Sequence, residues 1–425
     1  QRWFVDAARQ LLNGSWRIYE YNTITGILPL GTLPTGIVYS YSPLLALVLA
    51  PFVGLADLLK GTPLDASVGG GDQLAYRLIA LPLLVADVLA MEQFRQLARA
   101  WRPAVDEVAI FLGILPTMLV TGFLQVSAVQ DHHEGLILLL LLTTLRLTPR
   151  HLLWGGFFAG LALAAKHTTL LELLPIGAVL LLNRQATKHP WRAAFTWAGV
   201  ALAVFGAFML PPFLANPGAV VYAFVTLPQH LELFGPGLPG WIDGQLATTL
   251  GRASPDYALW HERILSYSNG VLVLVVAGLV GATLWWNRRR GRPVGLVDSR
   301  LLALVALAAL MQIVLGKWIG GHYYQLPLAL VLLWDTVRVA PRWPPIGLVS
   351  ALGFRAITIA LPLPGVPLPR GLALLGLFIV LAQVTLGAAW ESEPAVPPPT
   401  DTPPGRTAKA GESAAAAGLD SLAGF

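Results

Sequence analysis

The sequence predicts an all-α integral membrane protein, and three observations lead to this fold class. Only 12% of the 425 residues are charged, whereas a soluble globular domain carries about 25%. The mean hydropathy is high, at +0.64. Apolar runs close to the ~20 residues that cross a bilayer recur along the chain. About eleven such runs are expected to span, at 74–93, 105–127, 134–149, 151–165, 168–183, 193–213, 269–286, 301–316, 323–337, 344–362 and 371–389.

The composition excludes several classes of function. Cysteine is absent, so disulfides, thiolate catalysis and cysteine-ligated metals are excluded. The 42 glycines and 33 prolines fit membrane helices, which tolerate both residues better than soluble helices do. The formal net charge of +5 does not require nucleic acid, because the cytoplasmic loops of membrane proteins are basic in any case. No nucleic-acid partner is therefore expected.

The chain divides into three parts. Residues 1–73 are expected to form an external first loop with juxtamembrane helices, and 74–389 a multi-span transmembrane domain with an external loop at 214–268. The Pro/Ala-rich stretch 390–425 is expected to be a disordered cytoplasmic tail. Two prolines and an aspartate interrupt the apolar run 40–58, which favours a helix that dips into the outer interface. If this run spans instead, the residues before it are cytoplasmic.

Basic residues indicate which side of the membrane each turn faces. With eleven spans from residue 74 onward, five basic clusters share one side, which the positive-inside rule assigns to the cytoplasm. They are Arg95, Arg99 and Arg102; Arg146 and Arg150; Arg184, Lys188 and Arg192; Arg288, Arg289, Arg290, Arg292 and Arg300; and Arg338 and Arg342. The other side receives "QVSAVQDHHEG", "AAKHTT", the 214–268 loop and "GKWIGGHYYQ". The abundance of Ala, Leu, Gly, Pro and Arg suggests a GC-rich genome, so we expect a bacterial inner-membrane protein whose site faces outward.

Two of these polar clusters are predicted to lie below the outer surface. Eleven residues separate Glu134 from Arg146, and fourteen separate His151 from Lys166. At 1.5 Å per residue these stretches cover roughly 17–21 Å of a ~30 Å hydrocarbon core. Because a recessed carboxylate or ammonium is costly in lipid, we expect both clusters to line a water-filled cavity.

Six stretches occur in the order found in a known superfamily. They are "FVDAARQLLNGSWRIYEYN", "YSYSPLLALVLAPF", "GDQLAYRLIALPLL", "QDHHEGLILLLLLTTLR", "GFFAGLALAAKHTTLLELLP" and "GHYYQLPLALVLL". In these the chain resembles the GT-C superfamily, whose polytopic membrane glycosyltransferases take a sugar from a polyprenyl-phosphate carrier on the extracytoplasmic face. The resemblance covers most of the chain to about residue 340. It implies a polyprenyl-phosphate sugar donor and a glycan, lipid or protein acceptor in the envelope.

The resemblance also implies one more helix before Gln1, and so twelve in all. The chain opens with "QRWFVDAARQ", without an initiator Met or signal peptide, and we expect a further N-terminal piece. The family's acidic catalytic base would then fall immediately before Gln1, with Asp6 at a helix position after that motif. The family's Pro-Pro-Leu reads Ser42-Pro43-Leu44 here.

Asp131 is the first candidate for a functional carboxylate. The resemblance implies that it positions the acceptor or a divalent ion; alternatively it caps the following helix, with Glu134 three residues on. His132, His133 and Glu134 are candidate acceptor- or substrate-binding residues, and a carboxylate with an imidazole would also suit a metal. Adjacent His side chains diverge on a helix, so at most one is expected to join. Whether a metal cofactor is needed stays open.

Lys166 is the first candidate for binding the donor phosphate. Its ammonium suits a phosphate, and the alternatives are snorkelling to the interface or pairing with Glu172. His322, Tyr323 and Lys317 offer further donors to a phosphate. An aromatic belt at the membrane surface explains the tyrosine equally well.

Two further groups of residues leave alternatives open. The 214–268 loop carries aromatic and acidic residues that would suit a sugar acceptor, while interfacial packing also explains its tryptophans. These residues are Trp241, Asp243, Asp256, Tyr257, Trp260, His261 and Glu262. Arg2, Arg9 and Arg17 either meet a phosphate or form the solvated face of a helix, and the second is favoured.

The sequence therefore predicts a glycosyltransferase in which a carboxylate, Asp131 or Asp6, acts on the acceptor and Lys166 stabilises the departing phosphate. No nucleotide-binding glycine motif is found, as expected for a lipid-linked donor. One alternative is a secondary transporter or lipid-linked sugar flippase, against which the lack of a clear internal repeat weighs. Another is a noncatalytic subunit of an envelope complex.

Overall fold

The computed structural model describes residues 2–22, 26–27, 41, 43–60, 73–119, 133–183, 189–227, 237–316, 325–338, 376, 380, 383, 384 and 387. The chain separates into a unit of Gln1–Trp390 and one of Glu391–Phe425, and all described residues belong to the first. This part is helical apart from one antiparallel pair of two-residue strands, β1 (Tyr21–Asn22) and β2 (Gly26–Ile27). The predicted all-α class is therefore confirmed for the described residues.

Four described helices are long and apolar enough to cross a membrane. They are α2 (Pro43–Lys60), α3 (Gln73–Trp101), α9 (Pro190–Ala215) and α13 (Pro255–Arg289). Shorter helices fall at most of the other predicted spans: α4 (Glu107–Leu119), α6 (Glu134–Leu147), α7 (Leu152–Ala165), α8 (Leu170–Leu182), α14 (Ser299–Leu315) and α15 (Gln325–Val337). The membrane-helix character of the chain is thus confirmed, whereas the count of about eleven spans is not. The predicted spans 344–362 and 371–389 lie outside the described residues, apart from the isolated positions given above.

The apolar run around residue 50 forms one uninterrupted helix, α2, which continues through Pro51. The prolines therefore do not break the helix, and its length and composition also suit the alternative of a span. α2 packs against both α3 and α1 (Arg2–Leu12). Its aspartate, Asp57, is buried and accepts two hydrogen bonds from the Arg9 guanidinium, at 2.9 and 2.5 Å. A charge inside this apolar helix is thus neutralised by the first helix of the chain.

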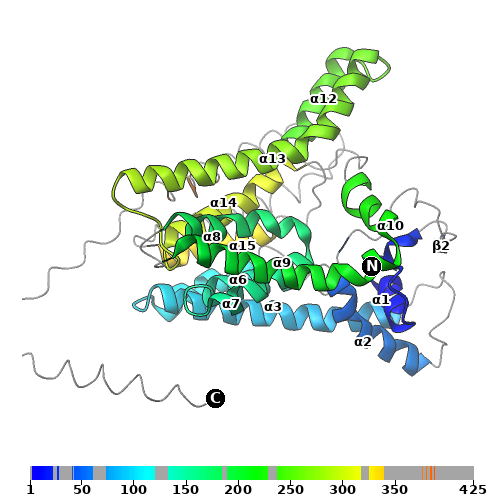
Figure 1. Cartoon of the computed structure of the whole chain (residues 1–425), viewed down its shortest axis with the longest axis horizontal. Helices are drawn as coiled ribbons and strands as arrows, with labels where there is room; N and C mark the ends of the chain where they lie inside the picture. Colours follow the sequence, from blue (N-terminus) through cyan, green and yellow to red (C-terminus); the bar gives the residue numbers. More distant parts are fainter. Residues whose placement is uncertain are drawn as a thin grey trace, which may run out of the picture. The chain divides into compact units, whose positions relative to one another are not determined.

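The 214–268 stretch, predicted as a loop, is largely helical. It contains α10 (Pro217–Val221), a π-helical turn η3 (Tyr222–Thr226), α12 (Leu238–Leu250) and the first turns of α13. At 1.5 Å per residue the 35 residues of α13 reach about 52 Å, well beyond a ~30 Å hydrocarbon core. The predicted span 269–286 lies in the C-terminal half of this helix. In Figure 1, α12 and the start of α13 stand clear of the other described helices.

Close packing in the bundle depends on two glycines of α7. A Cβ on Gly156 would lie 2.7 Å from the carbonyl oxygen of Trp197 in α9, and one on Gly160 would lie 2.5 Å from that of Ala201. The two backbones can approach only because neither position carries a side chain. This four-residue spacing fixes the α7–α9 pair, and α7 in turn presents its C-terminal end to the site described below.

Two hydrophobic cores position the site. The larger one joins α3, α4, α6, α7, α8, α9, α13, α14 and α15. The smaller one joins α1, the 3-10 turn η1 (Ile18–Glu20), α2, the start of α3 and the α10–η3 segment. Leu136, near the start of α6, packs against both cores. The N-terminal segment is therefore docked onto the same end of the bundle at which α6 begins.

Candidate functional site at the start of α6

Buried ionisable groups gather where α6 begins and α7 ends. Glu134 is the first residue of α6, and Lys166 is the residue that follows α7. Their side chains meet, with 3.3 Å between Lys166 Nζ and Glu134 Oε1, and the two residues are only 9% and 2% exposed. The ammonium thus turns inward to a carboxylate rather than snorkelling outward. Lys166 therefore forms its ion pair with Glu134 and not with Glu172, the structural partner that the sequence predicted.

The start of α6 differs from the predicted capping arrangement. The residue at the N-cap is His133, which makes no side-chain capping hydrogen bond. Glu134 is the first helical residue, so Asp131 cannot be the N-cap with Glu134 three residues on. Asp131 and His132 themselves lie outside the described residues. The capping interpretation of this polar cluster is therefore wrong.

His133 lies between the bundle and the N-terminal segment. Its buried ring meets the Tyr41 ring edge-on, with centroids 4.8 Å apart, and the Phe4 ring at 6.1 Å. Phe4 belongs to α1, which also carries the buried Asp6. Tyr41 is held in turn by Tyr19, whose hydroxyl donates to the Tyr41 carbonyl at 2.9 Å. The predicted site residues His133, Glu134 and Lys166 are thus brought together, with Asp6 on the helix that packs beside His133.

Asp87 is an ionisable residue that the sequence analysis did not single out. It lies within α3, is 0% exposed, and its Oδ1 occupies the place where a side chain on Gly135 would project. The first N–H groups of a helix have no intrahelical acceptor and carry the positive end of the helix dipole, so this position favours a carboxylate. A single acid in the apolar stretch "LLVADVLA" was the available signal, because intramembrane acids are costly and commonly functional.

The polar cluster continues from Lys166 into α8 and α14. The turn η2 (His167–Thr169) leads to α8, where Glu172 is buried. Gln312 of α14 donates to Glu172 Oε1 at 2.5 Å and to the Thr168 carbonyl at 3.3 Å. The described part of this cluster therefore contains three buried carboxyl groups, Asp87, Glu134 and Glu172, of which Glu134 pairs with the Lys166 ammonium.

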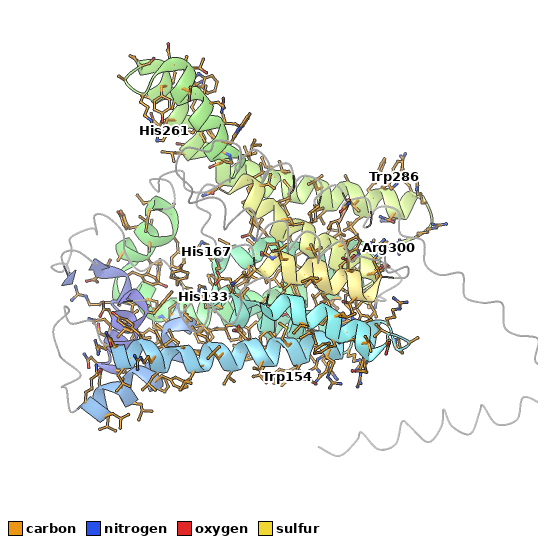
Figure 2. The ribbon with its side chains drawn as sticks, turned by 180° about the vertical axis from the view of Figure 1, so that it is seen from behind. His133, Trp154, His167, His261, Trp286 and Arg300 are labelled. Carbon is orange, nitrogen blue, oxygen red and sulfur yellow. The ribbon has the colours of Figure 1, made fainter. Side chains whose placement is uncertain are left out.

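An open apolar groove of about 430 Å³ adjoins this cluster. It is lined by His167 and by residues of α9, α10 and η3, namely Phe205, Gly206, Met209, Leu210, Phe213, Val220 and Phe224. The His167 ring packs edge-on against Phe224, with centroids 4.9 Å apart. Its Nδ1 is buried and has no hydrogen-bond partner among the described residues. His167, labelled in Figure 2, therefore brings the residue next to Lys166 into the wall of the groove, while its Nδ1 is buried beneath the apolar surface.

Arg9 and Arg17 of the first segment are each paired with a carboxylate, so these two neither form a solvated face nor offer free charge. Arg9 binds Asp57, as described above, and Arg17 binds Glu20, which also accepts from Asn216 at 2.9 Å. The hydrogen bond to Glu20 raises the pKa of the Arg17 guanidinium. These contacts join the N-terminal segment to α2 and α10. The side chain of Arg2 lies outside the described residues.

A second polar group lies between α12 and α13. His261 Nδ1 is 2.7 Å from Asp243 Oδ1, and the Tyr257 hydroxyl donates to Asp243 Oδ2 at 3.2 Å. Trp241 and Trp260, predicted either to stack on sugars or to pack at the interface, are exposed on the same hairpin. Asp243, Tyr257 and His261 therefore join the two helices through polar contacts, where a helical hairpin usually has apolar contacts.

The remaining predicted site residues cannot be placed. Lys317, His322 and Tyr323 lie outside the described residues, as Asp131 and His132 do. Within the described residues, no group of three His, Asp or Glu side chains has the geometry to hold a metal ion.

Comparison with known families agrees with this architecture. The model for glycosyltransferase family 87 matches residues 39–312, a range that includes Asp87, Glu134 and Lys166 but neither Asp6 nor His322. No curated protein matches the chain. The matched range covers well over half of the chain and runs from just before α2 into α14. The chain therefore belongs to glycosyltransferase family 87, a GT-C-type family of polytopic membrane glycosyltransferases.

Proposed function

We propose that this glycosyltransferase takes a sugar from a polyprenyl-phosphate carrier and transfers it to a glycan, lipid or protein acceptor at the outer face of a bacterial inner membrane. One observation carries the proposal: the wall of the apolar groove on α9 includes His167, the residue that follows Lys166 in the chain. A prenyl chain is apolar, and burying it in the groove is favourable at about 25 cal/mol per Å². The phosphate at its end would then lie where the groove reaches His167, near Lys166.

The groove faces the surroundings of the bundle and not its core. Leu210 and Phe213, two of its walls, are half-exposed on α9. A membrane-embedded carrier could therefore enter sideways from the lipid, without first leaving the bilayer. A nucleotide-linked donor would need polar walls for its base and ribose, whereas His167 is the one polar side chain in this lining.

The proposed chemistry is an inverting displacement. The acceptor hydroxyl oxygen forms a bond to the anomeric carbon while the bond from that carbon to the phosphate oxygen breaks. The electron pair leaves with polyprenyl phosphate, and a carboxylate takes the hydroxyl proton. We propose Asp131 or Asp6 for work on the acceptor, with His132, His133 and Glu134 contacting the substrate. Outside the matched range, Lys317, His322 and Tyr323 are proposed to contact the phosphate.

The charge balance of the cluster bears on how the phosphate is held. Lys166 pairs with Glu134, and the cluster holds two more buried carboxyl groups, Asp87 and Glu172, so the charge of Lys166 alone does not make the site electropositive. Further positive charge is required, and the proposed Lys317 and His322, or a divalent cation, would supply it. We propose that Glu134 orients Lys166, because a buried ammonium held at 3.3 Å is fixed before the donor binds.

The test uses the protein in proteoliposomes with radiolabelled polyprenyl-phosphate sugars and a membrane extract as the source of acceptor. Leu210→Trp would fill the groove, and Leu202→Trp is the matched control, since Leu202 is exposed on the same helix but does not line the groove. We expect the groove variant to raise the KM for donor at least tenfold, with the control unchanged. Equal kinetics in both variants would refute the groove as the carrier site.

The same assay separates the transferase from the flippase. Label that moves from lipid to acceptor shows transfer, whereas label that stays on lipid but crosses the bilayer shows flipping. Lys166→Met is expected to abolish the first, because removing one charge that stabilises a transition state typically costs 10²- to 10³-fold in rate. Family membership already favours the transferase.

A further inference from the structure

The C-terminal end of α13 carries four arginines in five residues, Arg288–Arg292, here termed the arginine turn. Figure 2 shows the neighbouring Trp286 and Arg300 at the opposite end of the helices from His133 and His167. This feature is therefore separate from the proposed transfer site. The positive-inside rule places it at the cytoplasmic leaflet.

The arginine turn is held in one backbone conformation. Gly291 has φ of 71°, the left-handed value that ends a helix and that glycine adopts without strain. Three backbone N–H groups of the turn donate back to carbonyl groups of the helix. The N–H of Arg290 donates to the Trp286 carbonyl at 3.2 Å, and the N–H of Gly291 donates to the Arg288 carbonyl at 3.1 Å. The N–H of Arg292 donates to the Asn287 carbonyl at 3.0 Å. These carbonyl groups at the end of α13 therefore have hydrogen-bond donors. Because unpaired carbonyl groups give a helix C-terminus its partial negative charge, pairing them reduces the repulsion of an anion there.

Arg300 supports the turn from inside. This buried residue donates through Nη1 to the Arg292 carbonyl and to Asn287 Oδ1, both at 3.0 Å. Asp298 neutralises it, with Arg300 Nη2 2.6 Å from Asp298 Oδ2. The fifth arginine of the predicted cluster is therefore structural, and its charge is already balanced.

The outer arginines are not balanced in this way. Arg288, Arg289 and Arg292 are exposed and form no ion pair with any carboxylate in the described part of the chain. Elsewhere at the same end, Arg95 pairs with Glu92 at 2.6 Å, and Arg99 pairs with Glu107. The positive charge of these three arginines is thus available to a partner.

Two tryptophans and a notch lie beside these charges. Trp285 and Trp286 are 51% and 39% exposed, and the guanidinium groups of Arg289 and Arg290 stack on them at 4.1 and 4.5 Å from the ring centroids. Exposed tryptophan is typical of the headgroup region of a bilayer. A notch of about 90 Å³ opens between α8 and α13, with Leu182 and Trp285 among its mainly apolar walls and Arg288 at its edge.

We propose that the arginine turn binds an anionic phospholipid, with its phosphate on Arg288 and Arg292 and the adjoining part of an acyl chain in the notch. Three features fit this occupant together: unbalanced positive charge, tryptophans at headgroup depth, and an apolar notch directly beside the charge. A soluble anion would use the charge but gain nothing from the notch or the tryptophans.

The test measures phosphatidylglycerol and phosphatidylcholine binding to the full chain in detergent by native mass spectrometry. The variant is Arg288→Gln with Arg292→Gln. The matched control is Arg150→Gln with Arg192→Gln, which removes two exposed arginines predicted on the same face. An arginine near an anionic lipid surface contributes about a fivefold gain in affinity, so the variant is expected to bind phosphatidylglycerol about thirtyfold more weakly.

Three results would overturn the proposal. One is equal phosphatidylglycerol binding by the variant and the unmodified protein. Another is an equal loss in the control, which would show that only the net charge matters. The third is displacement of phosphatidylglycerol by millimolar inorganic phosphate, which would indicate a soluble anion as the natural ligand. Phosphatidylcholine binding is expected to be the same in every variant.

Discussion

The Glu134–Lys166 pair allows the stability of the site to be separated from its chemistry. Lys166→Met removes the ammonium that lies 3.3 Å from a buried carboxylate. Breaking one side of a buried ion pair costs about 3–5 kcal/mol, because the charge that stays behind is no longer compensated. Replacing both partners, as Glu134→Leu with Lys166→Met, leaves no charge to compensate and is expected to restore most of that loss.

The assay has two readouts on the same purified variants. Unfolding in mixed detergent micelles gives the change in free energy, and sugar transfer in proteoliposomes gives the rate. We expect the single variant to lose both. The double variant should regain most of its stability while its transfer stays at least 10²-fold below that of the unmodified protein.

Two outcomes would refute this reasoning. If the double variant recovers transfer together with stability, the ion pair is a scaffold and Lys166 takes no part in the reaction. If the single variant loses less than about 1 kcal/mol, the pair behaves like an exposed one, and the burial that underlies the magnitude is incorrect.

Three further predictions concern the scaffold. Gly160→Leu should destabilise the bundle by at least about 2 kcal/mol, because its Cβ would meet the backbone of α9, whereas Gly199→Ala, with open space around it, should change melting temperature little; thermal unfolding of the two compares them. Gly291→Ala should cost about 1 kcal/mol, since alanine is strained at φ of 71°, and the same measurement checks it. Asp243→Asn weakens the contact to His261, and limited proteolysis should then cut the α12–α13 turn faster, the overall melting temperature being unchanged.

The helical class and most helix positions were predictable because an apolar run long enough to cross lipid has few other structures open to it. The length of apolar runs failed to predict the structure of 214–268, since such runs indicate contact with lipid and not helical conformation. The helix α13 changes in composition, from "PDYALWHERILSYSN" to a continuous apolar stretch, without changing its backbone. In the sequence, a helix that continues past the hydrocarbon core therefore has the same pattern as a polar loop followed by a membrane span.

The candidate site was predictable only where the signal was local. Short apolar runs end at His133, Glu134 and Lys166. Because these runs are too short to cross the hydrocarbon core, they predicted that the three residues lie below the outer membrane surface. Asp87 gave a weaker signal, because one acid does not interrupt a helix. Its neighbour, Gly135, lies on another helix far along the chain, and no local pattern links the two.

The two ends of the bundle treat charge in opposite ways, and this supports placing the chemistry at the start of α6. At the α6 end, carboxylates and an ammonium are buried against one another, which is costly and is retained where reacting charges must be positioned. At the α13 end, the buried Arg300 is balanced by Asp298, whereas the exposed Arg288, Arg289 and Arg292 have no acidic partner among the described residues. Exposed charge costs little and suits a surface contact, whereas buried, mutually held charge is what a displacement of phosphate requires.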